Sequence, residues 1–379
     1  MNTEPYLIIT SLTVLFYSLI TIALVWGLNR GRRRPRIQRT EPLVSVLVAV
    51  RNEQENIIPL LTNLTQLDYP AHKLQILIVD DKSTDRTVDI VATFQRSHEN
   101  VQLVRTLQTS TTLNGKANAL QQAMPHATGE IIFLTDADCQ VPQNWIRSHL
   151  SWYYGRVGMV GGFTLLSRRG QELDTFSRLQ ATDWLYLLAA GAGAAGLRRP
   201  LSVFGNNLSM RKKAFLDVNG YAGAGFSLIE DFALMRTMVQ RGWRVLLPAD
   251  PALVVQSAPE KDWQTFLQQR KRWAIGGRQV SFLARIFLAV AVAGRFIPLL
   301  PLIFGNIPAA GAALAAVFLC DYLLLHKAAG SLHRQDMLAN FFSYELFTFA
   351  SSLIFGPVLL FANSVAWKGR VYKSTAMVE

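Results

Sequence analysis

The sequence predicts an α/β domain with a mostly parallel sheet, held between apolar helices that belong to a membrane. Two observations lead to this prediction. Half of the 379 residues are hydrophobic and the mean hydropathy is +0.20, which is high for a purely soluble protein. Strand and helix patterns alternate in the middle of the chain, whereas both ends are apolar. We assign residues 1–40 to an N-terminal transmembrane helix with a basic end, 41–280 to a cytosolic α/β domain, and 281–379 to a C-terminal membrane region with a basic tail.

The N-terminal apolar segment sets the predicted topology. Residues 6–28 carry no charge and exceed the roughly 20 residues that cross a bilayer. A signal peptide is a weaker interpretation, because Glu4 stands where a basic region is expected and no small-residue cleavage site follows. Six arginines lie between Arg30 and Arg39, which places this end in the cytosol and the N-terminus outside. The same cluster supplies half of the net charge of +12, so we expect contact with anionic headgroups and no nucleic-acid partner.

Three apolar segments follow the α/β domain, at residues 286–305, 307–326 and 341–366. We expect the last two to span the membrane. The first contains Arg295 and two prolines, so it either spans or lies in the interface. We favour the interface, because this arrangement keeps the basic tail in the cytosol. Asp321 and Glu345 sit among apolar residues, where they either contact the polar head of a lipid or lie near an interface.

Strands and helices alternate in the domain between these membrane segments. Apolar and β-branched runs predict four strands, at residues 43–50, 74–81, 101–105 and 130–138. A helix follows the first strand, and Asn52 and Glu55 have capping-box spacing at its start. Three of the strands end in charged residues. Because the carboxyl ends of parallel strands meet at one edge of a sheet, and ligands bind there, these residues predict a binding site.

Two acidic pairs mark these strand ends. Asp136 and Asp138 are separated by one residue, and carboxylates so close repel each other unless a cation is bound. Mg²⁺ or Mn²⁺ fits, because such hard ions take oxygen ligands from one or two carboxylates and from substrate phosphates. A turn that caps the next helix explains the pair equally well on its own. Asp80 and Asp81 at a second strand end weaken that alternative, and together the pairs predict a nucleotide-diphosphate site.

Two further patterns lie later in the domain. Ser227 and Glu230 have capping-box spacing, so Glu230 is expected to be structural at least in part, whereas the cap does not use Asp231. The sequence Gln-x-x-Arg-Trp, residues 269–273, places a glutamine, an arginine and an indole on one face of a helix. This helix either rests on the membrane through its basic residues, or it holds a departing diphosphate and stacks on a sugar or acceptor. The Gly-rich segment 190–205 predicts a flexible flap over the acceptor entrance.

Seven segments resemble, in order and spacing, family 2 glycosyltransferases with the GT-A fold. The resemblance covers about residues 42–275 and rests on VSVLVAVRNEQENI, ILIVDDKSTDRT, NGKANAL, FLTDADCQVP, GNNLSMRKKAF, SLIEDFALMRTMVQRGWRV and QRKRW. The acids in the apolar segments and WKGRVY after the last one are more loosely similar to the membrane-bound branch that includes ceramide glucosyltransferases and related bacterial lipid glycosyltransferases. The resemblance implies a GT-A catalytic domain with one N-terminal and two to three C-terminal transmembrane or interfacial helices.

The resemblance also implies roles for individual residues. It assigns the nucleotide-sugar site to Ala49, Arg51, Glu53, Asp80, Asp81, Lys116 and Asp136, the metal site to Asp138 and Asp136, and the catalytic centre to Asp231, Glu230, Gln269, Arg272 and Trp273. Asp80 and Asp81 would contact the base or ribose. Asp231 would be the general base, which an acceptor hydroxyl needs in order to attack the sugar carbon. The alternative for Lys116 is a solvated lysine at the start of a helix.

The predicted activity is the transfer of a sugar from a nucleotide-diphosphate donor to a membrane-associated acceptor, expected to be a lipid, at the cell membrane. The resemblance implies a UDP-sugar donor, a divalent metal and inversion of the sugar carbon. Two alternatives stay open. One is a processive polysaccharide synthase of the cellulose, chitin or hyaluronan synthase type, because these enzymes share the Gln-x-x-Arg-Trp pattern. The other is a non-catalytic, membrane-anchored binder of nucleotide sugars.

Overall fold

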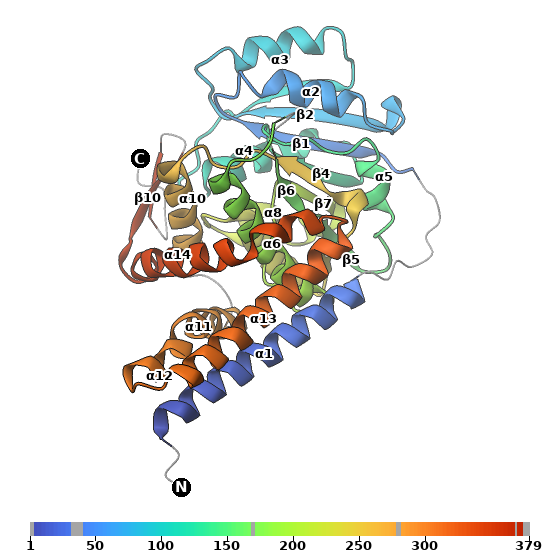
Figure 1. The fold of residues 1–379 in the computed structure, drawn as a ribbon. Helices are drawn as coiled ribbons and strands as arrows, with labels where there is room; N and C mark the ends of the chain where they lie inside the picture. Colours follow the sequence, from blue (N-terminus) through green and yellow to red (C-terminus); the bar gives the residue numbers. More distant parts are fainter. Residues whose placement is uncertain (1–3, 32–40, 168–170, 278–281, 368–369, 374–379) are drawn as a thin grey trace.

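The computed structural model describes residues 4–31, 41–167, 171–277, 282–367 and 370–373, and its central element is a seven-stranded sheet (Figure 1). The strand order is β3-β2-β1-β4-β7-β5-β8. The strands are β1 (Val44–Val50), β2 (Leu74–Asp80), β3 (Val101–Arg105), β4 (Ile131–Thr135), β5 (Val157–Gly161), β7 (Asn207–Arg211) and β8 (Arg244–Leu246). The first four strands are parallel neighbours, and only β7 runs antiparallel, between β4 and β5. The predicted mostly parallel sheet is therefore confirmed.

Helices cover both faces of this sheet and bury its apolar residues. The helices on one face are α2 (Ile57–Thr65), α3 (Thr87–Gln95) and α5 (Trp145–Leu150), and those on the other are α4 (Gly115–Ala123), α7 (Lys212–Asp217), α8 (Gly220–Ala224) and α9 (Glu230–Gln240). Two small sheets complete the domain, β6 (Thr164–Leu166) with β9 (Val255–Ser257), and the hairpin of β10 (Ser364–Trp367) with β11 (Arg370–Lys373). Fully buried side chains on both faces explain why the strands are apolar along their whole length.

The start of α2 differs from its prediction. The helix begins at Ile57, after Asn56, and no side chain caps it. Asn52 instead adopts a left-handed backbone conformation with φ of 55°. Its Oδ1 accepts a hydrogen bond from the Thr84 amide at 2.8 Å. The asparagine therefore joins the loops after β1 and β2, and the capping box predicted from Asn52 and Glu55 is wrong.

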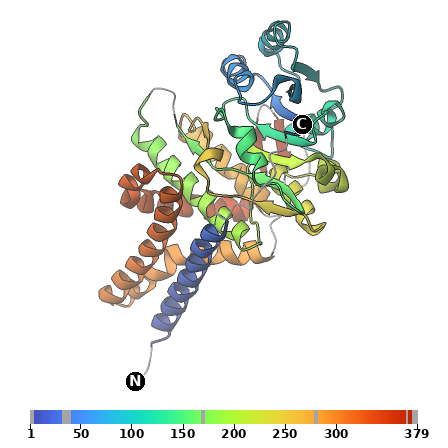
Figure 2. The ribbon, with the colours of Figure 1, turned by 90° about the vertical axis from the view of Figure 1, so that its right-hand side faces the viewer.

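Four helical segments of the described residues are long and apolar enough to cross a membrane. They are Pro5–Gly31, Ala284–Ile303, Ile307–Ser331 and Gln335–Val358. They contain the helices α1 (Pro5–Gly31), α12 (Leu300–Ile303) and α13 (Ile307–Ser331), and most of α11 (Phe282–Phe296) and α14 (Phe341–Phe361). Helices α1 and α13 project away from the sheet, whereas α14 lies next to α10 (Trp263–Gly276) (Figures 1 and 2). Length and composition thus make the segment with Arg295 a candidate span, and its place in the interface stays a prediction.

The acids in the apolar helices face a buried arginine. Arg295 of α11 pairs with Asp321 of α13, and its Nη1 lies 2.9 Å from Glu345 Oε2 of α14. Tyr17 of α1 donates a hydrogen bond to Asp321 Oδ1 at 2.5 Å. Both acids are almost completely buried. They therefore link four helices, and these protein partners favour a structural role over the alternative of contact with the polar head of a lipid.

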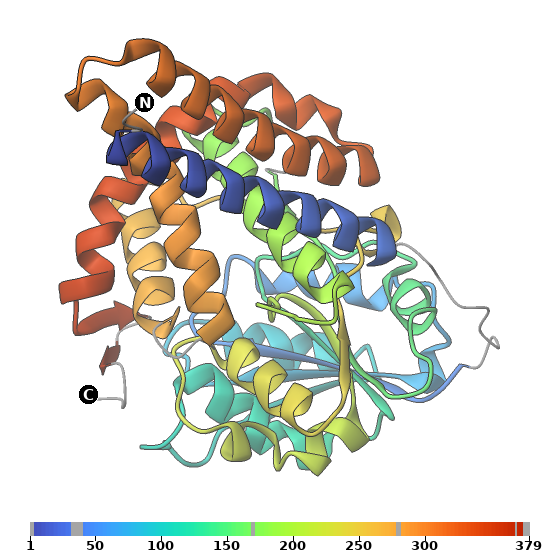
Figure 3. The same ribbon diagram turned by 90° about the horizontal axis from the view of Figure 1, so that it is seen from below.

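Helix α6 (Thr175–Gly196) crosses α1 at a contact made by glycines (Figure 3). A Cβ on Gly193 would lie 2.5 Å from the Leu24 carbonyl oxygen, and a Cβ on Gly27 or Gly196 would overlap the backbone of the other helix. Small residues here let the two backbones approach closely. The glycines at 190–196 are thus helical and packed, so the flap predicted for residues 190–205 is wrong in this part.

Replacing Gly193 by alanine should destabilise the protein, because the added methyl group meets the backbone of α1 and neither helix can yield without losing contacts. We expect a loss of about 1–3 kcal/mol, typical of overpacking. Gly311→Ala in α13 is the matched control, since a Cβ there has no atom within 4 Å. It should be neutral or slightly stabilising, because alanine favours helix. Thermal unfolding of the detergent-solubilised variants measures both. Equal melting temperatures would contradict the close α1–α6 contact.

Candidate active site

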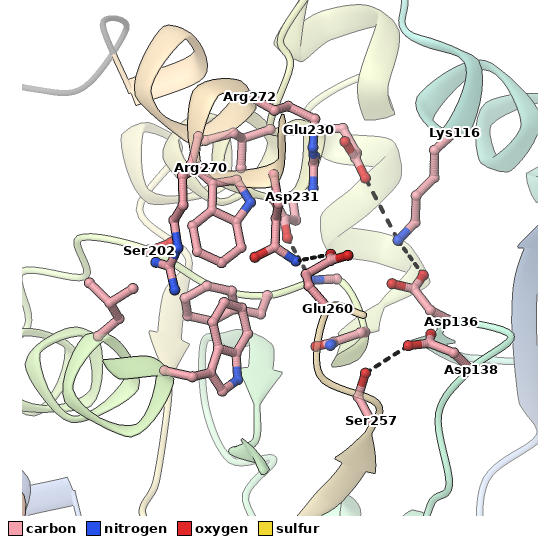
Figure 4. Close-up of a pocket in the computed structure, with 18 of the residues that line it drawn as sticks. Lys116, Asp136, Asp138, Ser202, Glu230, Asp231, Ser257, Glu260, Arg270 and Arg272 are labelled. Atoms are coloured by element: carbon pink, nitrogen blue, oxygen red, sulfur yellow. Dashed lines mark hydrogen bonds and ion pairs between the residues drawn. The ribbon is translucent and has the colours of Figure 1, made fainter. Parts of the chain in front are cut away.

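A cavity of about 560 Å³ opens at the carboxyl ends of β1, β2 and β4 (Figure 4). The parallel pairing brings these three ends to one edge of the sheet. Helices α4, α6, α9, α10 and α11 and the hairpin β10–β11 supply its other walls. The cavity therefore collects residues from both the α/β domain and the C-terminal region.

Twelve of the thirteen residues predicted for the site line this cavity. They are Ala49, Arg51, Glu53, Asp81, Lys116, Asp136, Asp138, Glu230, Asp231, Gln269, Arg272 and Trp273. Asp80 does not belong to the lining, in contrast to the prediction. It is buried at the end of β2, and its Oδ1 accepts a hydrogen bond from the Ser83 amide at 3.1 Å. Asp80 thus holds the turn that presents Asp81.

Asp81 forms a bidentate ion pair with Arg370 of the C-terminal hairpin. The two nitrogens Nη1 and Nη2 lie 2.6 and 3.1 Å from the carboxylate oxygens. The neighbouring Gly115 approaches both side chains so closely that a Cβ would overlap the guanidinium. Its amide donates to the buried hydroxyl of Tyr372 at 3.4 Å. The hairpin is thereby attached to the β2 side of the cavity, beside the start of α4.

Lys116 lies between two acids from different elements. Its Nζ is 2.5 Å from Asp136 Oδ1 and 3.8 Å from Glu230 Oε1, and Figure 4 shows the amine between them. Although burial favours the neutral amine, these carboxylates raise the pKa of Lys116 above its usual value, so it stays charged. Asn114 caps α4 and donates to Glu230 Oε2 at 3.0 Å. The alternative of a solvated lysine is therefore wrong.

Asp138 faces the cavity from the segment after β4. Ser257 donates a hydrogen bond to its Oδ2 at 2.7 Å. Burial and the nearby carboxylate of Asp136 raise the pKa of Asp138. No group of three or more His, Cys, Asp or Glu side chains among the described residues could hold a metal by itself. Two carboxylates that line this cavity nevertheless fit Mg²⁺ or Mn²⁺, which complete their shells with water and phosphate oxygens.

Asp231 is held in the first turn of α9 by backbone donors. The amide of Gly205 lies 2.5 Å from its Oδ2, and the amide of Phe232 lies 2.7 Å from its Oδ1. Burial, together with the adjacent Glu230, raises the pKa of Asp231 to about 7. The predicted capping box is absent, because Ser227 bonds to the backbone of Ile229. Glu230 is therefore free of a capping role and instead contacts Asn114 and Lys116.

The three Gln-x-x-Arg-Trp side chains turn toward the cavity from α10. Gln269 donates to Glu260 at 2.6 Å, and Arg272 donates to the Leu228 carbonyl at 3.1 Å. The ring of Trp273 lies 5.0 Å from that of Trp184 on α6. Arg270 pairs with Asp183 and covers the face of Trp273 at 4.5 Å. These contacts favour the site interpretation of this helix over contact with headgroups through Arg270 and Arg272.

Arg370, Glu260 and Trp184 line the cavity, and sequence reasoning did not assign them to the site. Arg370 stands in the segment WKGRVY, which was part of the resemblance, yet no local pattern pairs it with Asp81. Glu260 precedes the N-cap of α10, and both its amide and its carbonyl are bonded to the Gln180 side chain. Trp184 lies within a long apolar helix, where an aromatic residue indicates packing first. For Arg370, the position of a basic residue just after the last apolar segment was the only sequence feature that could have indicated a place in the site.

Curated relatives match about two thirds of the chain. The beta-monoglucosyldiacylglycerol synthase of Nostoc sp. is 28% identical over 276 residues, which cover 70% of this chain and 57% of that protein. A probable glycosyltransferase, YdaM, of Bacillus subtilis is 27% identical over 257 residues, which cover 65% and 58%. The poly-beta-1,6-N-acetyl-D-glucosamine synthase of Staphylococcus aureus is 27% identical over 266 residues, which cover 70% and 61%. The chain thus spans less than two thirds of the length of these relatives.

Solved structures show the same fold. A mannosyltransferase from Pyrobaculum calidifontis, in complex with GDP-Man and Mn²⁺, superposes with a TM-score of 0.59 at 20% identity, over 93% of this chain and 99% of that one. The α/β domain therefore has the GT-A fold that the resemblance implied. The sequence model of glycosyl transferase family 21 matches residues 6–376. Because this match extends from α1 to the C-terminal hairpin, the chain belongs to glycosyl transferase family 21.

Proposed function

We propose that this chain transfers a sugar from a nucleotide-diphosphate donor to a hydroxyl group of a membrane lipid. The observation that carries the proposal is the arrangement of acids in the cavity. Asp136 and Asp138 line it at the end of β4, and Asp231, a buried carboxylate with a raised pKa, lines it from α9. Such a cavity offers separate places for a diphosphate and for a proton acceptor. The monoglucosyldiacylglycerol synthases among the relatives support a lipid acceptor.

The donor side is proposed from charge. Asp138, with Asp136, would hold Mg²⁺ or Mn²⁺, which neutralises the diphosphate when it is bound. The likeness to a structure with GDP-Man and Mn²⁺ supports a nucleotide sugar and a divalent ion. Lys116 and Arg370 supply two further cations at this side. We propose a UDP-sugar, with Ala49, Arg51, Glu53 and Asp81 around the nucleoside.

The acceptor side is proposed from the position of Asp231. Its carboxylate is held by two amides, so it points in a constant direction in the cavity. There it would take the proton of the acceptor hydroxyl as the oxygen attacks the sugar carbon, and the nucleotide diphosphate would leave. This single displacement inverts the sugar carbon. Gln269, Arg272 and Trp273 would hold the diphosphate and the sugar.

The proposed location is the cell membrane, with the catalytic domain in the cytosol. Four helices that could cross a membrane support membrane integration. The arginines of residues 30–39 support a cytosolic domain, since basic residues next to a span stay on that side.

A processive polysaccharide synthase is the second candidate. The poly-beta-1,6-N-acetyl-D-glucosamine synthase among the relatives favours it, as does the Gln-x-x-Arg-Trp pattern. Product length separates the two candidates. A ladder of long oligosaccharides from membranes that contain the protein would replace our proposal by this one.

Lipid extracts give the direct test of the proposed function. Membranes that contain the protein should gain a lipid whose mass has increased by one sugar, and mass spectrometry of that lipid identifies sugar and acceptor together. Asp138→Ala should abolish this product, because it removes the carboxylate proposed to anchor the metal and diphosphate. Chelation with EDTA should do the same, and Mn²⁺ or Mg²⁺ should restore the product. An identical lipid profile for parent and Asp138→Ala would refute the proposal.

Asp231→Asn should lower the rate of transfer by about 10²–10⁴-fold, the usual contribution of a general base. Nucleotide-sugar binding should change little, because the amide keeps the shape of the carboxylate and still accepts one of its two backbone hydrogen bonds. Asp89→Asn is the control, since this acid lies exposed on α3 outside the cavity. Single-turnover transfer and calorimetric binding separate the two effects. Unchanged turnover in Asp231→Asn would exclude Asp231 as the base.

The rate should also depend on pH near neutrality. A general base must be ionised, and the pKa of Asp231 is raised to about 7. Values of kcat/KM should therefore fall about tenfold per pH unit below pH 7 and level off above it. An ordinary carboxylate would titrate near pH 4 and leave the rate constant over this range. If kcat/KM stays constant between about pH 5.5 and 8, the rate does not depend on a carboxylate with a pKa near 7, and the proposed link between Asp231 and the rate is contradicted.

A further inference from the structure

The catalytic cavity continues beyond Asp231 into a part lined by apolar side chains. We call this part the apolar arm, and its residues are Trp184, Leu187, Phe204, Trp273, Phe287 and Leu288. They come from α6, from the loop after it, from α10 and from α11. The arm is therefore built where the α/β domain meets the C-terminal apolar helices.

Continuous contacts join the apolar arm to the proposed base. The amide of Gly205 donates to Asp231, and the preceding Phe204 places its ring 4.7 Å from Trp184. Trp184 in turn lies 5.0 Å from Trp273. Phe287 of α11 packs in the same apolar cluster. A hydroxyl group at Asp231 would thus have apolar side chains on the side away from the acids.

The outer end of the arm is open and apolar. Leu187 is 36% exposed and Leu288 is 41% exposed, although both line the cavity. Leu288 belongs to Ala284–Ile303, one of the segments long and apolar enough to cross a membrane. An opening beside such a helix faces hydrocarbon if the helix enters the bilayer. Exposed leucines would be costly in water but cost nothing there.

Charge at the border of the arm is already balanced by the protein. Arg270 covers the indole face of Trp273 and pairs with Asp183. Its side chain is 12% exposed. The arm therefore presents apolar surface, which suits a hydrocarbon chain better than a polar sugar polymer.

We propose that the apolar arm holds the hydrocarbon tail of the acceptor and opens sideways into the bilayer between α6 and α11. The inference rests on the proposed function and adds the route by which the lipid enters. The lipid stays in the membrane, its tail occupies the space between Leu187 and Leu288, and only its hydroxyl end reaches Asp231. Tail length then becomes a determinant of which lipids are glycosylated.

Tryptophan substitutions that fill the arm test the proposal in the full chain. Leu187→Trp and Leu288→Trp are compared with Ile286→Trp, because Ile286 lies on the same helix as Leu288, is 42% exposed and does not line the cavity. Each variant is placed in membranes with a natural mixture of lipid chain lengths and supplied with UDP-glucose or GDP-mannose. Mass spectrometry gives the tail composition of the glycosylated lipids. Calorimetric binding of UDP and GDP reports on the donor side.

We expect the two arm variants to lose about tenfold or more of the long-tailed products relative to short-tailed ones, because the indole occupies the space of the tail and steric overpacking by one or two methylene groups costs about that much. Nucleotide binding should stay within about twofold of the parent. Ile286→Trp should keep the parent's tail profile. A folding defect lowers all products together and leaves the profile unchanged, so an unchanged profile in the arm variants overturns the inference while the proposed function stands. A parent that glycosylates no lipid overturns both.

Discussion

Repulsion between carboxylates gathered at the carboxyl edge of the sheet is the constraint on which this site depends. Parallel pairing brings Asp81 and the Asp136–Asp138 segment to one cavity, and α9 adds Glu230 and Asp231. Such a concentration of buried negative charge is unstable unless cations compensate it. Lys116 compensates two of the acids from the start of α4. Its place in the fold is therefore set by charge as much as by packing.

Arg370 compensates the remaining strand end from the other end of the chain. The ion pair with Asp81 spans 289 positions and is bidentate, which is the geometry in which arginine and carboxylate bind best. It holds the C-terminal hairpin over the cavity, so the segments after α14 become part of the site. A donor diphosphate would bring further negative charge to this region. Binding of the proposed donor would then be coupled to the position of the hairpin through the Arg370 guanidinium.

Helix α6 connects this charged edge to the apolar helices. One side of it meets α1 through Gly193, where the backbones touch. Another side supplies Trp184 and Leu187 to the cavity. The buried pairing of Arg295 with Asp321 and Glu345 orders the helices that flank it. A buried ion cluster specifies one arrangement of helices, because a misplaced charge among apolar residues has no partner.

At Asp231, the stability of the fold and the proposed role as a base oppose each other. Its pKa is raised to about 7, so the folded protein binds a proton more tightly than the unfolded chain, for which the ordinary value is near 4. The stability that this adds is fully present below the unfolded value and is lost as the pH rises through 7. Near neutral pH, Asp231 is therefore partly ionised and able to accept a proton, and the protein is less stable than it would be with Asp231 protonated.

The sequence by itself determined the elements and the acids at their ends. Strand and helix periodicity located β1 to β4, and Asp136 and Asp138 were placed at a strand end by position alone. These features are local, because side-chain periodicity and the end of an apolar run are properties of a few neighbouring residues. Caps were less predictable, since Asn52 bonds to the loop after β2 and Ser227 bonds to the backbone of Ile229, just before α9 begins. A short polar side chain has several acceptors within reach, and only packing selects among them.

The tertiary structure alone decided which distant groups meet. No local pattern joins Arg370 to Asp81, Arg295 to Glu345, or the two glycine surfaces of α1 and α6. It also removed Asp80 from the cavity lining and turned the Gly-rich segment into a packed helix. The physical reason is that charge compensation and close backbone contact act through space. Both depend on how whole helices and strands pack together. A sequence pattern reports only on residues within a few helical turns of each other.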